Sequence, residues 1–322
     1  MKSILFKHWK FYFHFVQCLL ISFILIGCTA ETDPLPNEEE EQPLDAVKVV
    51  TVTAENILSG NGHSRSLFTL ENDKLKFSWT EGDKIGVYPS NGTQIAFAIK
   101  SGAGGNTAKF DGGSWALRET EAYAAYYPYD ENNATRKNTQ LRFSYEGQCQ
   151  TGNASLAHLG AYDWMATQAT QAVDKELNFQ FKHLNCVAQL RLSIPAVATF
   201  HSLTIRCDED IFTKVANLDL SGTNFVYSAT ETTSQLQMEL KDISTTSDKK
   251  DLILYMTLPP VDMMGKSVAV VLHSTNNKVY QGVLESKILK AGYAYSFTAN
   301  MVDVTVSSTI TSPNFGTSDK EI

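Results

Sequence analysis

The feature that most constrains the fold is a short-range alternation of apolar and polar residues that recurs along the chain. Leu75, Phe77 and Trp79 share one parity, and the segment at 95–99 repeats the pattern. Side chains that alternate in this way lie on one face of a β-strand. Gly, Asn, Asp and Pro separate these runs, and no long amphipathic helix is visible after residue 30. The pattern predicts an all-β protein of the sandwich type.

Two of the cysteines follow the same alternation of apolar residues. Cys186 has the parity of the apolar residues around it in 184–194, and Cys207 has the parity of Leu203 and Ile205. Both are predicted to be small buried side chains on strands. A Cys186–Cys207 disulfide stays open, because spacing alone cannot establish its geometry, and the state of Cys149 is equally open.

The N-terminus has the layout of a secretory signal. Three lysines precede an apolar run over residues 11–26, which is about 16 residues long and short for a bilayer-spanning helix of roughly 20. The run ends in Leu-Ile-Gly-Cys at 25–28, which looks like a bacterial lipobox. We expect residues 1–27 to be removed and Cys28 to carry lipid that holds the chain to a membrane. An uncleaved membrane anchor is the alternative.

A proline-rich acidic segment follows Cys28. Residues 28–45 hold three prolines and many acids without apolar periodicity, so we expect a disordered tether. Its acids loosely resemble the surface-export signals of Bacteroidetes lipoproteins, although a plain solvated linker explains them equally well. The last residues, 309–322, are predicted to be a tail.

Charge and length restrict the class of protein. Removing the three lysines of residues 1–27 changes the formal charge from −8 to −11. An acidic chain without basic clusters is a poor nucleic-acid binder. The remaining chain of about 295 residues is long enough for two domains, and one large β-domain is the alternative. Polar segments at 166–176 and 245–251 are candidate seams, the second more suited to a hairpin loop.

Catalytic and metal-binding patterns are not found. The sequence has no G-x-S-x-G elbow, no H-E-x-x-H motif and no phosphate loop, so neither an enzyme nor a cofactor is expected. The acids at 208–210 are predicted to form an exposed turn rather than a calcium site. His183 is interpreted as a strand-surface histidine. Trp79, Trp115 and Trp164 are considered as a sugar-stacking platform, with Trp79 predicted to be core.

Four segments in order resemble the fimbrillin family of Bacteroidales surface fibres. Together they extend over most of residues 75–301, and their sequences are FSWTEGDKIGVYPSNG (77–92), TAKFDGGSWALRETEAYAAYYPYD (107–130), AHLGAYDWMATQAT with LNFQFKHLNCVAQLRLSI (157–194), and ILKAGYAYSFTANM (288–301). The lipoprotein-like start fits the same family.

The resemblance implies two transthyretin-like Greek-key β-sandwich domains, which we expect at 46–172 and 173–308. It also implies assembly by strand exchange: a protease removes the first strand, and a neighbouring subunit supplies a replacement. Here the first strand is expected at 47–54, with a cleavage point at Arg65 in the glycine-containing loop that follows. Val302, Val304 and Val306 share one face of a candidate donor strand. The alternatives are that Arg65 is an ordinary loop arginine and that residues 302–306 are the domain's own last strand.

The resulting hypothesis is a non-enzymatic surface lipoprotein, a subunit of or accessory to a fimbria, with an adhesion role. Its expected partners are other fimbrial subunits or itself, the outer membrane through the lipid anchor, and a host or bacterial surface ligand, without nucleic acid. The expected location is the cell outer membrane or cell surface. A glycan-binding surface lipoprotein of a nutrient-uptake system is the alternative, and it requires exposed aromatic side chains.

Overall fold

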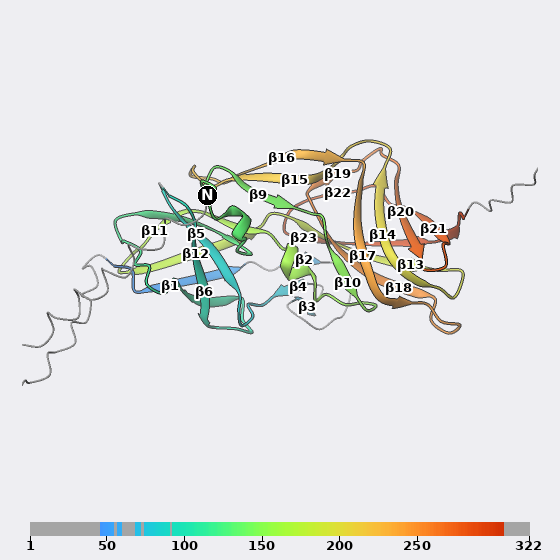
Figure 1. Ribbon diagram of the computed structural model, residues 1–322, viewed down its shortest axis with the longest axis horizontal. Coiled ribbons are helices and arrows are strands. Elements are labelled where there is room, and N and C mark those ends of the chain that lie inside the picture. The colour runs from blue at the N-terminus through green and yellow to red at the C-terminus, as the bar shows by residue number, and fades with distance from the viewer. Residues whose placement is uncertain (1–45, 55–56, 60–67, 72–73, 91, 306–322) are drawn as a thin grey trace, which may run out of the picture. The chain divides into compact units, whose positions relative to one another are not determined.

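The computed structural model describes residues 46–305 except 55–56, 60–67, 72–73 and 91 (Figure 1). Within these ranges the extended elements are all strands, which confirms the all-β prediction. Two short 3-10 turns, η1 (Glu131–Asn133) and η2 (Leu159–Tyr162), accompany them. No helix in the described part of the chain is long and apolar enough to cross a membrane.

Seven strands form a closed barrel. In hydrogen-bonded order they are β1 (Val49–Ala54), β12 (Glu176–His183), β11 (Met165–Gln171), β8 (Ala122–Tyr127), β5 (Lys84–Pro89), β6 (Ile95–Ser101) and β7 (Thr107–Asp111). The ring closes because β7 pairs with β1. A closed barrel leaves no strand edge unpaired.

The turn before β5 shows how the sequence sets the barrel locally. Gly82 adopts φ +90°, a left-handed conformation that favours glycine. The backbone N–H of Thr80 donates to Asp83 Oδ2 at 2.7 Å, and Tyr127 Oη donates to Asp83 Oδ1 at 3.1 Å. Burial raises the pKa of Asp83, although these hydrogen bonds oppose the shift. The turn at Gly82 and Asp83 is therefore tied to the barrel core.

Two open six-stranded sheets hold most of the remaining strands (Figure 1). One sheet has the order β10 (Cys149–Thr151), β17 (Gln235–Ser244), β14 (Thr199–Cys207), β20 (Val268–Ser274), β21 (Val279–Leu284) and β24 (Val302–Asp303). The other has the order β18 (Asp251–Leu258), β13 (Cys186–Ser193), β23 (Tyr293–Asn300), β2 (Ile57–Ser59), β4 (Lys74–Phe77) and β3 (Phe68–Glu71).

Two smaller sheets complete the described fold. The three-stranded one contains β16 (Val226–Thr233), β15 (Phe212–Asp219) and β9 (Leu141–Ser144), and the two-stranded one contains β19 (Val261–Asp262) and β22 (Ile288–Leu289).

The buried apolar side chains gather in two clusters. One fills the barrel and includes the predicted stripe Leu75, Phe77 and Trp79. The Trp79 ring makes edge contacts with Phe77 and Tyr127, and its Nε1 donates to the carbonyl of Asn106 at 3.0 Å. The other cluster lies mainly between the open sheets and contains every member of the predicted 184–194 stripe. Alternation therefore identified the core faces correctly.

The two polar segments proposed as seams have a different structure from the one expected. Residues 166–176 contain most of β11 and a tight turn at Asp174 and Lys175, both with positive φ, that leads into β12. β11 and β12 pair with each other inside the barrel. Residues 245–251 are not a hairpin loop, because β17 and β18 on either side of them belong to different sheets.

Candidate functional site

β1 is the strand that closes the barrel. It pairs in parallel with β12 from Val49↔Glu176 to Ala54↔Phe181, and antiparallel with β7 through Val50↔Phe110 and its neighbours. Val50, Val52 and Ala54 point into the barrel core and are buried. Without β1, both β7 and β12 would present unpaired backbone groups on either side of an apolar gap.

The next strand along the chain enters a different sheet. β2 pairs in parallel with β23, at Leu58↔Tyr293 and Ser59↔Ala294, and antiparallel with β4. The segment 46–59 therefore supplies one strand to the barrel and one to an open sheet. Loss of this segment would leave edges in both places.

The last described strand lies at the edge of its own sheet. β24 pairs with β21 through Tyr280↔Asp303 and Gln281↔Val302. Val302 and Val304 are 57% and 41% exposed. Hydrogen bonds from Thr305, together with Lys278 Nζ at 2.9 Å, lower the pKa of Asp303 to about 2. Residues 302–305 are all exposed, so a shared face for the two valines stays a prediction.

Several predicted features lie outside the described residues. These are the signal at 1–27, the lipidation site Cys28, the tether at 28–45, the cleavage point Arg65, Val306 and the tail at 309–322. They stay predictions from the sequence.

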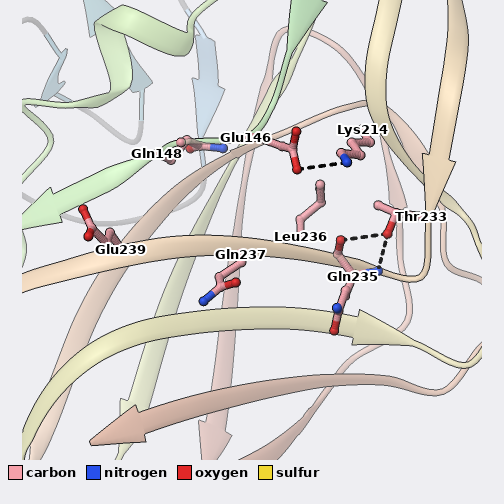
Figure 2. Close-up of a pocket in the computed structure, with 9 residues that line it drawn as sticks. Glu146, Gln148, Lys214, Thr233, Gln235, Leu236, Gln237 and Glu239 are labelled. Atoms are coloured by element: carbon pink, nitrogen blue, oxygen red, sulfur yellow. Dashed lines mark hydrogen bonds and ion pairs between the residues drawn. The ribbon is translucent and has the colours of Figure 1, made fainter. Parts of the chain in front are cut away.

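A polar groove of about 380 Å³ lies where β17 begins (Figure 2). Its lining comes from β17, from the 146–148 connection, from Lys214 of β15 and from Thr233 of β16. Lys214 Nζ lies 3.2 Å from Glu146 Oε1, and the Thr233 hydroxyl both accepts from and donates to the backbone of Gln235. The lining residues include no histidine, cysteine or aromatic side chain. The groove offers hydrogen bonds but no nucleophile with a base beside it.

The three tryptophans do not form a shared platform. Trp79 and Trp164 are buried, and the Trp164 ring stacks on Phe143 with centroids 4.3 Å apart. Trp115 is 64% exposed and lines a separate groove of about 260 Å³ beside the start of β1. Only one of the three can therefore meet a ligand at the surface.

His183 is buried, so the interpretation as a strand-surface histidine is wrong. Its Nδ1 lies 2.7 Å from Asp163 Oδ1, and both side chains are almost inaccessible to solvent. Asn185 Nδ2 donates to the same carboxylate oxygen at 3.2 Å, and the Phe77 ring packs against the imidazole. A buried carboxylate and imidazole in contact replace the hydration that each loses on burial.

The sequence carried a signal for this burial. His183 has the parity of Leu177, Phe179 and Phe181, which all point into the barrel. The partner, Asp163, lies before β11 and twenty residues away. Alternation can predict that the imidazole is buried, but it cannot identify the carboxylate that it meets.

The cysteines and the acidic turn lie where the sequence predicts. Cys186 and Cys207 are buried, and all three cysteines of the described chain are free thiols. Residues 208–210 are exposed, and Glu209 pairs with Lys266 Nζ at 2.6 Å. The described residues contain no group of three or more His, Cys, Asp or Glu side chains arranged to hold a metal ion.

Comparison with known families gives a clear assignment. The profile of the fimbrillin-like family matches residues 69–312, which is most of the chain. The chain belongs to the fimbrillin-like family. A search of curated proteins finds no match.

Solved structures show a related fold. A proposed cell adhesion protein from Bacteroides ovatus ATCC 8483 has a TM-score of 0.52 at 17% identity, covering 81% of this chain and 96% of that one. A proposed cell adhesion protein from Bacteroides uniformis ATCC 8492 has a TM-score of 0.47 at 14% identity, covering 82% and 99%. The tip fimbrial protein Mfa3 from Porphyromonas gingivalis has a TM-score of 0.30 at 11% identity, covering 74% and 83%. The similarity to the Bacteroides ovatus structure, at a TM-score of 0.52, supports the fold alone.

Proposed function

We propose that this chain is a non-enzymatic, lipid-anchored surface protein, a subunit of or accessory to a fimbria that assembles by strand exchange, with an adhesion role. The observation that carries the proposal is the position of β1. It is bonded on both sides, it closes the barrel, and it precedes Arg65 in sequence. Membership of the fimbrillin-like family supports the same assignment.

The acceptor site in this proposal is the gap that β1 fills. Cleavage after Arg65 separates β1 and β2 from the rest of the chain. The edges of β7 and β12 can then bond a replacement strand, and the positions that Val50, Val52 and Ala54 occupy become pockets for its alternate side chains. Backbone hydrogen bonds supply affinity and the pockets supply specificity.

The donor in this proposal is the C-terminal end of a second subunit. β24 pairs with β21 at the edge of its sheet, and Val302 and Val304 are exposed. Release of this strand must also break the bond from the Val304 N–H to Val279 O and the ion pair of Lys278 with Asp303, which the replacement of β1 in the acceptor has to offset. Val306 continues the same parity.

The proposal also covers location and domain division. The lipobox-like end at Cys28 attaches the chain to the outer membrane, and the tether at 28–45 holds the folded part away from it. Its partners are other subunits, or itself, and a surface ligand. The two transthyretin-like domains, expected at 46–172 and 173–308, are also part of the proposal. The pairing of β12 with β11 inside the barrel supports moving the proposed boundary from residue 172 to after His183.

Limited cleavage of the soluble chain, residues 29–322, by an Arg-specific protease tests this function. We expect a cut after Arg65 followed by a ladder of detergent-resistant oligomers on an unboiled gel. Arg65→Ala is the matched control and should remain an uncut monomer. A wild-type chain that is cut and stays monomeric contradicts the strand-exchange function.

Glycan binding is the second candidate function, and Trp115 favours it. This exposed indole borders the groove at the start of β1, whose lining also includes Lys48 and Lys109. An aromatic face beside polar groups is suited to a sugar ring. Tight binding of the uncut monomer on a carbohydrate array, lost in Trp115→Ala, would favour this function over fimbrial assembly.

A further inference from the structure

β18 is an edge strand whose sequence favours pairing with another chain. Residues 252–258, Leu-Ile-Leu-Tyr-Met-Thr-Leu, contain no charge, proline or glycine. Such segments, when they lie at a sheet edge, are strong templates for strand addition. β18 pairs with β13 on one side only, and no other strand of the described chain pairs with its second edge.

Side chains from another part of the fold cover that second edge. The backbone N–H groups of Ile253, Tyr255 and Thr257 donate to Asn153 Oδ1 at 2.7 Å, Gln150 Oε1 at 2.7 Å and Gln148 Oε1 at 2.8 Å, respectively. These are alternate residues, as expected for the groups that face away from β13.

The outward carbonyls of the same three residues are bonded as well. Gln148 Nε2 donates to Thr257 O at 2.8 Å, and His158 Nε2 donates to Tyr255 O at 3.0 Å. The carbonyl of Ile253 accepts from Gln150 Nε2 at 3.2 Å and from the N–H of Ala154 at 2.9 Å. Every outward backbone group from residue 253 to residue 257 therefore has a partner in residues 148–158.

The backbone of the same segment is fixed to the neighbouring sheet. β10 pairs in parallel with β17, and further bonds join Glu239 N to Gln148 O and Gly152 N to Lys241 O, both at 2.8 Å. Because β10 is extended, Gln148 and Gln150 project to the same side, which faces β18. Both side chains are buried.

We propose that residues 148–158 form an edge shield that prevents a second copy of this chain from adding a strand to β18. An incoming strand would have to displace hydrogen bonds that already exist, so it would gain little from pairing there. The shield acts in the uncut chain and does not depend on the proposed fimbrial role.

Residue-resolved amide exchange and light scattering of the soluble chain, residues 29–322, test the shield. In the wild type, the amides of Ile253, Tyr255 and Thr257 should be as protected as those of Leu252 and Leu254, which face β13. Rapid exchange of the amides of Ile253, Tyr255 and Thr257 in the wild type would overturn the proposal without any variant.

Removing the side-chain amides of Gln148 and Gln150 should expose the outer edge of β18 without unfolding the sheet. In Gln148→Ala with Gln150→Ala, the N–H groups of Tyr255 and Thr257 lose their acceptors, whereas Ile253 keeps Asn153. We expect exchange at 255 and 257 to be at least about tenfold faster, with concentration-dependent association and recovered protection at these two amides in the associated form. Gln237→Ala, an exposed amide on β17, is the matched control and should leave exchange and association unchanged. If the double variant does not fold, Asn153→Ala, which removes a half-buried side chain, should accelerate exchange at 253.

Two results contradict the proposal. One is a folded double variant whose β18 edge amides exchange rapidly but which does not associate at high protein concentration. If only Asn153→Ala folds, the same result in that variant contradicts the proposal. The other is association that leaves the opened amides unprotected (255 and 257 in the double variant, 253 in Asn153→Ala), because the second copy would then bind elsewhere.

Discussion

The barrel and the open sheets protect their strand edges by different means. In the barrel, β1 bonds β7 and β12 with its backbone and leaves no edge. In the open sheet that ends at β18, amide and imidazole side chains of residues 148–158 bond the outer edge. A backbone strand can be replaced by another strand of the same geometry, whereas a set of fitted side chains cannot. We therefore expect the barrel, at the position of β1, to accept a strand from another chain more readily than the edge of β18 does.

The largest expected effect comes from breaking the barrel's own closure. Val52→Asp places a carboxylate in the fully buried core between β7 and β12 and should cost more than about 4 kcal/mol of unfolding free energy. Denaturant unfolding measures the loss. Thr51→Asp, on the outward face of the same strand, is the control and should change stability far less. Equal losses in both variants would show that β1 is not oriented as described.

A somewhat smaller loss is expected at the junction of β11 and β12. Asp163→Ala removes one partner of the buried pair with His183 and should destabilise the fold by about 3–5 kcal/mol. Asp163→Asn keeps an acceptor oxygen for the imidazole and should lose less. Urea unfolding midpoints decide the order. A loss in Asp163→Ala below about 1 kcal/mol would mean that the pair is not needed to close the barrel.

The edge shield should contribute less than either of these. Gln150→Ala leaves the Tyr255 N–H without its acceptor, and an unsatisfied buried group costs about 1–3 kcal/mol. The exposed control Gln237→Ala should stay within about 0.5 kcal/mol of the wild type. Thermal or urea unfolding of the two variants side by side measures the contrast. Identical stabilities would argue against any energetic role for the shield.

The smallest effect is a pH dependence of the shield. Burial lowers the pKa of His158 from its usual 6.5, although its bond to the Tyr255 carbonyl opposes the shift. The unfolded chain therefore binds a proton at this residue more readily, so stability should fall as pH decreases below 6.5 and level off below the folded pKa. His158→Gln, which keeps a donor, should flatten this part of the profile. A variant profile parallel to the wild type would assign the pH dependence to other groups.

Much of the fold could be predicted because strand faces are local properties. The stripe Leu75, Phe77 and Trp79 and the stripe at 184–194 follow from alternation alone, and both are core. Strand partners are not local. The parallel pairing of β1 with β12 joins residues more than a hundred positions apart, and nothing in either segment specifies the other. The segment at 245–251 resembles a hairpin loop for the same reason: its composition does not reveal that the strands around it enter different sheets.

The candidate site was predicted only in part. The position of the first strand agrees with the sequence. The roles of Gln148, Gln150 and His158 could not be predicted, because a polar side chain outside a catalytic or metal-binding pattern is ordinarily interpreted as solvated. Their partners lie about a hundred residues later in the chain. Burial of an amide or imidazole becomes interpretable only when the edge that it bonds is known.

The most direct test of the contrast is residue-resolved amide exchange before and after cleavage next to Arg65. If β1 is the replaceable cover, amides of β7 and β12 that bond β1 should lose protection in the cut chain and regain it in oligomers. The amides of Ile253, Tyr255 and Thr257 should stay protected throughout. Full protection of β7 and β12 in a cut monomer, or loss of protection at β18 on cleavage, would contradict the account.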